Sequence, residues 1–294
     1  MKMSDLMLVT GATGSTGKAA VRELRQAGAR VRAFVHRDDA RADALRDLGA
    51  EVMVGDLLDL AAVRAATTGV TAAYFVYPIR SGLVDATAYF AQAASEAGVT
   101  FIVNMSQISA RSDAKSNAAR QHWVCERMLD RSGIPVVHLR PTFFAQWLLY
   151  FGRGSRIAST GQIVLPFGEG RHAPIAGEDQ GRLIAAILRD PAPHAGKTYP
   201  LYGSTEMNHH EIAAQVSTVL GKKISYTAQS ISDFKAQLES LNAPQHLVQH
   251  LCEVAQDYQD GIFAGTNDII ERVTGRPPLT VPEFVELHRA EFSA

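Results

Sequence analysis

The sequence is poor in cysteine, has no long apolar run and carries no excess of either charge. Its two cysteines, Cys125 and Cys252, are too isolated for a disulfide framework or a cysteine zinc site. No apolar run approaches the ~20 residues that span a bilayer, and the first strand pattern follows only five residues, so we expect a soluble cytoplasmic protein. With 29 basic residues, 30 acidic residues and a formal net charge of -1, the sequence lacks the basic stripe that nucleic-acid binding needs.

Apolar segments of strand length alternate with segments of helical periodicity in the first half of the chain. The expected strands are 6–10, 31–35, 51–56, 72–78, 101–106 and 136–141, and the expected helices are 18–26, 40–48, 60–66, 86–97 and 118–131. Strands that alternate with crossover helices predict an α/β fold with a doubly wound, parallel Rossmann-type sheet.

The pattern changes near Phe143 to aromatic and glycine-rich stretches, followed by further helical segments. We therefore expect a nucleotide-binding domain over residues 1–150 and a smaller, mostly helical substrate lobe over residues 151–294. A segment such as KTYPLYG is expected to return to the main sheet, so that the two lobes interleave.

A glycine-rich turn lies between the first strand and the first helix. Its glycines have GxxGxxG spacing, and small residues there let the backbone approach a diphosphate whose charge faces the free N–H groups of the helix. The predicted pyrophosphate-binding residues are Gly11, Thr13, Gly14, Ser15, Thr16 and Gly17. The alternative is that the glycines only make a tight strand-to-helix turn.

The residue that distinguishes NAD from NADP stands about 20 residues beyond this turn. Arg37, preceded by His36, stands twenty residues after Gly17. A bidentate guanidinium suits a 2′-phosphate, so the sequence predicts NADP(H). In the alternative, Asp38 or Asp39 holds the ribose hydroxyl and Arg37 is an ordinary solvated charge.

Asp56 and Leu57 follow the third expected strand. Their position suits a carboxylate bonded to the edge of the adenine and a leucine packed on its face. Asp56 is equally well explained as a carboxylate that ends a strand or caps a helix.

Several segments together resemble the NmrA-like branch of the atypical short-chain dehydrogenase/reductases. They are GATGSTG, VHR, VGDLLD, NMSQIS, HWVCERMLDRSGIPVVHLRPTFF and NHHEIAAQVSTVLGKKISY, and they cover nearly the whole chain. This family includes triphenylmethane dye reductases, NADPH-dependent quinone reductases and non-catalytic redox sensors. The resemblance therefore implies NADP(H) binding without choosing among these functions.

The catalytic residues implied by the resemblance depart from the pattern of the wider superfamily. Ser106 stands where the catalytic serine is expected, whereas His122 and Glu126 replace the tyrosine and lysine of YxxxK. Residues four apart share one helix face, so both can point toward the nicotinamide. We expect His122 to serve as a proton donor that Glu126 keeps charged. The alternative is that His122 lies on the helix surface and Glu126 only accepts a hydrogen bond from ribose.

Aromatic residues follow the fourth and sixth expected strands. Ligands bind at the carboxyl ends of strands in such sheets, which predicts a substrate pocket lined by Tyr77, Pro78, Phe143, Phe144 and Trp147, with Tyr77 also a catalytic candidate. For each of these residues singly, a place in the core between the lobes is an equally good interpretation.

No metal site is predicted. His209 and His210 are adjacent on an expected helix, so their side chains point about 100 degrees apart, and no third ligand is suitably spaced. Asn208 is expected to cap that helix.

The sequence thus favours an NADPH-dependent reductase of a quinone-like, dye-like or other conjugated aromatic acceptor. Hydride transfer survives the loss of YxxxK because the cofactor carries that chemistry. The main alternative is a non-catalytic NADP(H)-binding redox sensor or regulatory protein, and an isomerase or dehydratase with tightly bound cofactor is a third. Expected partners are a small substrate and a second copy in a homodimer, with neither nucleic acid nor membrane.

Overall fold

The computed structural model describes residues 5–150 and 153–293. The chain divides into two compact units, each built from several segments. Unit 1 contains the residues up to Ala114, Ala118–Arg140 and Glu178–Tyr199, and unit 2 contains Lys115–Asn117, Pro141–Gly177 and the residues from Pro200 onward. The division of function at residue 150 stays a prediction.

A seven-stranded sheet confirms the predicted Rossmann-type fold. Its strands are β1 (Leu6–Thr10), β2 (Arg30–Val35), β3 (Glu51–Val54), β4 (Val70–Phe75), β5 (Phe101–Met105), β6 (Val136–Pro141) and β9 (Thr198–Leu201). They follow the order β3-β2-β1-β4-β5-β6-β9, and the ladders from β3 to β6 are parallel. The strand order reverses between β1 and β4, which is where a doubly wound sheet opens a crevice for a ligand.

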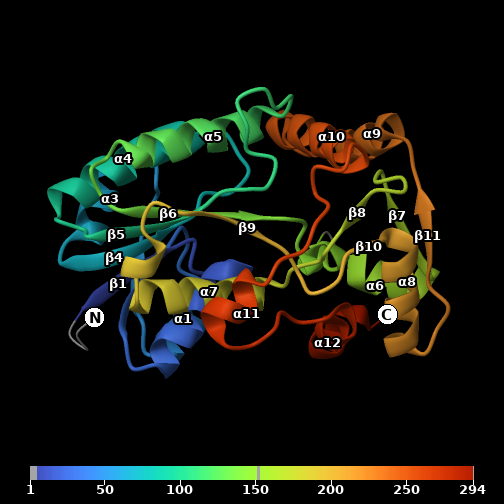
Figure 1. Ribbon diagram of the computed structural model, residues 1–294, viewed down its shortest axis with the longest axis horizontal. Coiled ribbons are helices and arrows are strands. Elements are labelled where there is room, and N and C mark those ends of the chain that lie inside the picture. Colours follow the sequence, from blue (N-terminus) through green and yellow to red (C-terminus); the bar gives the residue numbers. More distant parts are fainter. Residues whose placement is uncertain (1–4, 151–152, 294) are drawn as a thin grey trace. The chain divides into compact units, whose positions relative to one another are not determined.

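Helices cover both faces of this sheet in unit 1. They are α1 (Ser15–Gln26), α2 (Ala40–Asp47), α3 (Leu60–Thr67), α4 (Leu83–Glu96), α5 (Asn117–Asp130), α7 (Gly177–Arg189) and the short 3₁₀ helix η3 (Ala192–His194). Figure 1 shows α3, α4 and α5 on one face and α1 and α7 on the other. The Asp39 and Asp59 side chains accept hydrogen bonds from the first backbone N–H groups of α2 and α3, which fixes where these helices begin.

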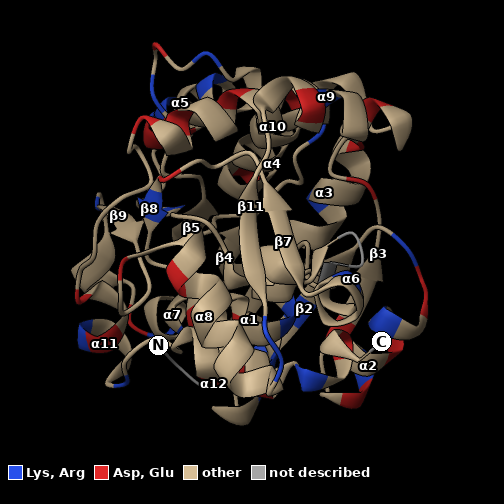
Figure 2. Ribbon diagram, turned by 90° about the vertical axis from the view of Figure 1, so that its right-hand side faces the viewer, with Lys and Arg blue, Asp and Glu red and all other residues tan. Residues whose placement is uncertain are grey.

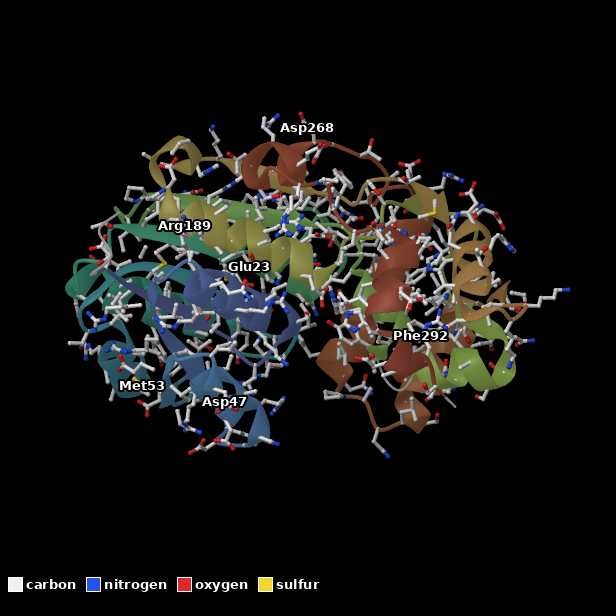
Figure 3. The ribbon with its side chains drawn as sticks, turned by 90° about the horizontal axis from the view of Figure 1, so that it is seen from below. Glu23, Asp47, Met53, Arg189, Asp268 and Phe292 are labelled. Carbon is white, nitrogen blue, oxygen red and sulfur yellow. The ribbon has the colours of Figure 1, made fainter. Side chains whose placement is uncertain are left out.

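The helices α1 and α7 lie side by side, as Figures 1 and 3 show. A Cβ atom on Gly181 of α7 would lie 2.3 Å from the Cβ of Ala19 on α1. Only glycine allows so close an approach, so this contact draws residues 178–199 back onto unit 1 although they follow a long part of unit 2.

The core of unit 1 is apolar on both faces of the sheet, as parallel strands require. All residues of β1 and β5 are buried. Phe75 of β4 stacks on Phe90 of α4 with ring centroids 4.5 Å apart.

Unit 2 contains short strands and most of the later helices. Its strands are β7 (Gln162–Leu165), which pairs in parallel with β11 (Ser225–Ala228), and β8 (Arg171–His172), which pairs antiparallel with β10 (Met207–Asn208). Its helices are η1 (Ala145–Leu148), α6 (Arg153–Thr160), α8 (His209–Leu220), α9 (Ile231–Ser240), α10 (Gln245–Gln259), α11 (Ile269–Thr274), α12 (Val281–Leu287) and η4 (Arg289–Phe292). Asn208 forms a capping box with Glu211, which confirms the predicted start of α8.

Acidic and basic side chains are interspersed along α2, α5 and α9, as Figure 2 shows.

Within residues 5–150 and 153–293, no helix is both long enough and apolar enough to cross a membrane. The same described residues contain no group of three or more His, Cys, Asp or Glu side chains placed to hold a metal ion.

Candidate active site

Thr10 links the end of β1 to the residue that follows β4, at the point where the strand order reverses. Its hydroxyl donates to the carbonyl oxygen of Val76 at 3.2 Å and accepts from the N–H of Val76 at 2.9 Å. Gly11 follows with a φ of 55°, and a Cβ there would lie 2.6 Å from Cγ1 of Val76. Glycine is therefore required by both conformation and space.

Gly17 lets the first turn of α1 rest against the end of β1. A Cβ on Gly17 would lie 2.4 Å from the carbonyl oxygen of Gly11 and 2.8 Å from Cα of Ala12. Gly14 is the N-cap, and its N–H donates to the Gly11 oxygen at 2.9 Å. Among the described residues no side chain caps this helix, and its first turn contains no acidic residue. The turn therefore fits a diphosphate, which the free N–H groups and the helix dipole would both attract.

The three hydroxyl residues of the turn differ in their surroundings. Thr13 and Ser15 are half-buried, whereas Thr16 is buried with its hydroxyl 2.9 Å from that of Tyr74. Burial raises the pKa of Tyr74, so this phenol stays protonated. Because Tyr74 already engages the Thr16 hydroxyl, Thr16 is better placed to offer its backbone N–H to a diphosphate.

Arg37 stands exposed just beyond β2, and the structure gives its guanidinium no hydrogen bond or ion pair with any described residue. The two neighbouring carboxylates are engaged. Asp38 lies 2.7 Å from Arg46, and Asp39 accepts from the N–H of Arg41 at 3.0 Å while it caps α2. The cation is thus available to a phosphate, and neither carboxylate is available to a ribose hydroxyl without losing a partner.

Asp56 at the end of β3 connects residues from three loops. Its carboxylate accepts from the N–H of Leu58 at 2.9 Å, and it lies 3.6 Å from Nδ1 of His36 and 3.5 Å from the guanidinium of Arg80. Leu57 is 9% exposed and belongs to the apolar core of unit 1. Asp56 therefore already forms a turn just after its strand, while its side chain stays 37% exposed.

Tyr77 continues this chain of contacts. Its ring is buried, and its hydroxyl accepts from Nε of Arg80 at 3.0 Å and donates to the carbonyl oxygen of Ser81 at 2.9 Å. Pro78 beside it is exposed. The Tyr77 hydroxyl is held in place by these two bonds, so a role in proton transfer would require one of them to break.

Buried polar atoms without partners gather in sequence after β5 and on α5. Ser106 is 4% exposed, and its backbone N–H bonds to the Leu139 oxygen at 2.7 Å. Among the described residues, Oγ of Ser106, Nε2 of Gln107 and Oε1 of Gln121 have no hydrogen-bond partner. Such atoms are costly unless a ligand satisfies them, which makes these three side chains candidates for contact with cofactor or substrate.

His122 and Glu126 are both buried on α5. Burial lowers the pKa of His122 to about 4, although the charge of Glu126 opposes this shift. Glu126 receives two hydrogen bonds from Arg140, at 2.8 and 2.5 Å, and lies 3.6 Å from Arg127. The imidazole is therefore neutral near pH 7, and the carboxylate is committed to a buried ion pair.

The predicted pocket residues after β6 lie in unit 2. Phe143 is 6% exposed and packs against Phe167 and Phe263, each with ring centroids 4.8 Å away. Phe144 is half-buried and forms an isolated bridge with Ile175. Trp147 is also half-buried, and it lines a cavity of about 310 Å³.

Six residues that contribute to this site were not predicted from the sequence: Thr10, Tyr74, Arg80, Gln107, Gln121 and Arg140. A signal existed for Gln107, since polar residues at the carboxyl end of a buried parallel strand commonly face a ligand. Arg140 gave only a weak signal, as a charge near the end of an otherwise apolar strand, because its partner Glu126 lies on another element.

The comparisons with known proteins agree on one family. A model of the NmrA-like family matches residues 3–283. The NAD(P)H azoreductase of Xenophilus azovorans is 30% identical over 289 residues, which cover 98% of this chain and 100% of that protein.

Solved structures show the same fold. An NADPH-dependent quinone oxidoreductase of Escherichia coli, complexed with NADPH, matches with a TM-score of 0.84 at 26% identity and covers 96% of this chain and 99% of that chain. The triphenylmethane reductase of Citrobacter sp., complexed with NADP(H), matches with a TM-score of 0.82 at 24% identity and the same coverage.

Replacing Gly17 by alanine should abolish tight dinucleotide binding. The added methyl group would collide with the backbone of Gly11 and push the start of α1 away from β1. We expect the Kd for NADPH, measured by calorimetry, to rise at least about tenfold. Gly28→Ala, just beyond the other end of α1, controls for general destabilisation: a Cβ there meets nothing within 4 Å, but the φ of 77° disfavours alanine, so the variant is strained away from the turn. Equal affinities for the Gly17→Ala variant and the parent would contradict the assignment.

Replacing His122 by glutamine should flatten the dependence of stability on pH. The pKa of His122 is about 4 in the folded protein and 6.5 ordinarily. Between pH 4 and pH 6.5 the unfolded chain therefore binds a proton at this residue that the folded protein does not bind. The parent should therefore lose about 3 kcal/mol of stability through this group as pH falls from 6.5 to 4. Denaturant unfolding across this range measures the effect, with exposed His210→Gln as control. Parallel curves for the His122→Gln variant and the parent would rule out a buried, neutral His122.

Proposed function

The chain belongs to the NmrA-like family, and we propose that it is an NADPH-dependent reductase of a quinone-like, dye-like or other conjugated aromatic acceptor. The observation that carries this proposal is the glycine turn between β1 and α1, which no side chain of the described residues caps and where a Cβ on residue 17 would lie 2.4 Å from the Gly11 oxygen, so that only glycine fits. A dinucleotide bound there would lie along the carboxyl ends of the parallel strands.

We assign different parts of the cofactor to different residues of unit 1. In this proposal the turn from Gly11 to Gly17 holds the diphosphate, and Arg37 with His36 receives the 2′-phosphate. Asp56 and Leu57 lie on the adenine side. The two carboxylates that would favour NAD are both engaged, Asp38 by Arg46 and Asp39 at the start of α2, which supports NADP over NAD.

Bound NADPH supplies the hydride, and the protein supplies position and polarity around the acceptor. Oγ of Ser106 and the amides of Gln107 and Gln121 are buried donors and acceptors that suit the oxygen or nitrogen of a conjugated acceptor. His122 is neutral near pH 7, so it can offer an N–H hydrogen bond but holds no ready excess proton. Acceptors that stabilise negative charge by conjugation, and then take a proton from water, fit this environment.

The wider setting of the protein is also part of the proposal. We assign nucleotide binding to residues 1–150 and substrate binding to residues 151–294, with a homodimer in the cytoplasm and no nucleic-acid partner. The two free cysteines support a location in the cytoplasm. The balance of 29 basic against 30 acidic residues supports the absence of a nucleic-acid partner.

Purified protein should oxidise NADPH when given a neutral quinone, a cationic triarylmethane dye or a conjugated enone. We expect turnover with at least one of these acceptors and none with cyclohexanone, because a simple ketone needs an acid to protonate its alkoxide. The loss of NADPH absorbance measures the rate. Absence of turnover with every conjugated acceptor, combined with tighter binding of one NADP redox form and a conformational change, would instead favour the redox sensor.

Replacing Arg37 by glutamine should selectively weaken NADPH. Loss of a charge-assisted hydrogen bond to the 2′-phosphate should raise the KM for NADPH about tenfold or more, while the KM for NADH stays within about twofold. Arg64→Gln is the matched control, since it removes the same charge from an exposed arginine on α3 whose partner, Glu96, is not among the predicted cofactor-binding residues. Steady-state kinetics with both cofactors measure the two KM values. Equal increases in KM for NADPH and for NADH would refute the role of Arg37.

A further inference from the structure

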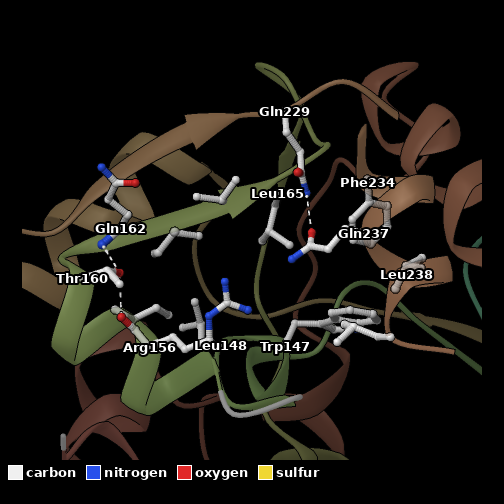
Figure 4. Close-up of a pocket in the computed structure, with 14 residues that line it drawn as sticks. Trp147, Leu148, Arg156, Thr160, Gln162, Leu165, Gln229, Phe234, Gln237 and Leu238 are labelled. Atoms are coloured by element: carbon white, nitrogen blue, oxygen red, sulfur yellow. Dashed lines mark hydrogen bonds between the residues drawn. The ribbon is translucent and has the colours of Figure 1, made fainter. Parts of the chain in front are cut away.

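Unit 2 contains a cavity of about 310 Å³ that the dinucleotide site does not use. Its lining comes from η1, α6, β7 and α9, as Figure 4 shows. The volume lies at the lower end of the range that small-molecule sites occupy, roughly 300–1,000 Å³. The cavity can therefore hold a molecule of one or two rings.

The apolar part of the walls comes mainly from two elements. On α9 and its C-cap the lining residues Phe234, Leu238 and Leu241 recur at helical spacing. On β7 the alternate residues Ile163 and Leu165 are buried, at 1% each.

Trp147 of η1 adds a broad aromatic surface to this lining. It packs against the cluster that contains Phe234 and Leu238, so the indole ring is fixed in place. Such walls suit a flat aromatic body, which gains from burial of its apolar area and from contact with rings.

One charged residue, Arg156, lines this space; it is exposed, so water also reaches its side chain. Figure 4 shows its guanidinium extending from α6 into the cavity, with Trp147 and Phe234 on the far side. The structure gives this guanidinium no hydrogen bond or ion pair with a described residue, and the described lining contains no Asp or Glu. The local charge is therefore positive and uncompensated.

A second donor faces the same space from α9. Oε1 of Gln237 accepts a hydrogen bond from Nε2 of Gln229 at 3.3 Å, which turns the amide nitrogen of Gln237 toward the cavity. Thr160, by contrast, uses its hydroxyl locally, to donate to the carbonyl oxygen of Arg156 and to accept from the N–H of Gln162. The cavity thus presents a guanidinium and an amide N–H to one ligand.

We infer that this cavity binds an organic anion with an aromatic body, such as an aromatic carboxylate or sulfonate. The rings lie against Trp147 and the apolar face of α9, and the anionic group accepts hydrogen bonds from Arg156 and Gln237. A guanidinium prefers oxygen anions because its donors match them in pairs. Arg156 would repel a cation, and a neutral apolar molecule would accept no hydrogen bond from it.

The test compares two ligands of the same shape on the full-length protein without cofactor. The probes are 2-naphthoate and its neutral analogue 2-naphthamide, and the measurement is quenching of tryptophan fluorescence, confirmed by calorimetry. We expect 2-naphthoate to bind more tightly than 2-naphthamide. Arg156→Gln should weaken 2-naphthoate at least about tenfold, leave 2-naphthamide within about twofold, and be partly rescued by Arg156→Lys.

Lys235→Gln provides the matched control for charge alone. Lys235 is exposed on α9, outside the lining, so its replacement removes one positive charge without touching the cavity. Its affinity for 2-naphthoate should match that of the parent. Equal binding of both probes, no binding of either, or an unchanged affinity for 2-naphthoate in the Arg156→Gln variant would overturn the inference, and an unchanged melting temperature of that variant shows that it is folded.

A kinetic arm, which rests on the proposed reductase activity, separates two sources of the anion. If the anion is part of the acceptor, Arg156→Gln weakens the apparent binding of a naphthoquinone sulfonate during turnover but not that of the unsulfonated naphthoquinone, and 2-naphthoate competes with the sulfonated quinone. If it is a separate effector, 2-naphthoate changes the turnover of the neutral quinone without competition. The binding experiment needs no turnover, so failure of the site and failure of the proposed function are distinguishable.

Discussion

The contact between Gly17 and the backbone of Gly11 is the constraint on which the nucleotide site depends. It brings the first turn of α1 so close to the end of β1 that a Cβ would lie 2.4 Å from the Gly11 oxygen. Thr10 then ties the same end of β1 to Val76 beyond β4, across the point where the strand order reverses. Because these contacts hold the turn against the end of β1, the first N–H groups of α1 are already positioned before a diphosphate binds, which lowers the entropic cost of binding.

Most of the sheet was predictable because its signal is local. Five buried residues in a row at 101–105 confirm a strand predicted over 101–106, and KTYPLYG joins the sheet as β9, as expected. The strands β7, β8, β10 and β11 were not predicted from the sequence. Each has two to four residues, and each exists because a partner far away in the chain completes its hydrogen bonds. Strand propensity over so few residues is too weak a signal without that partner.

The residues of the candidate site also differ in whether the local sequence is enough to predict their role. The glycine spacing could be predicted because its position between a strand and a helix is enough to interpret it, whereas Ser106 was expected only from the family resemblance. Pairings across elements could not: the sequence placed Thr16 at the diphosphate without showing that Tyr74 holds its hydroxyl, and it placed Glu126 near a ribose without showing Arg140. Helical periodicity predicts which residues lie on the same face of a helix, but it does not predict which element packs against that face.

The pairing of Glu126 with Arg140 bears directly on the chemistry. Removing one partner from a buried ion pair costs about 3–5 kcal/mol because the other charge is left uncompensated, so Glu126 is poorly suited to give up Arg140 for a proton during each turnover. His122 beside it is neutral, since burial lowers its pKa to about 4. In the proposed reductase, the residues that stand in place of YxxxK would therefore form a polar wall with no ready proton. Such a wall can orient an acceptor and bond to it, but it cannot drive the reduction of a group whose product anion is strongly basic. Conjugated acceptors spread that charge over many atoms, and for them hydride transfer can precede protonation by water.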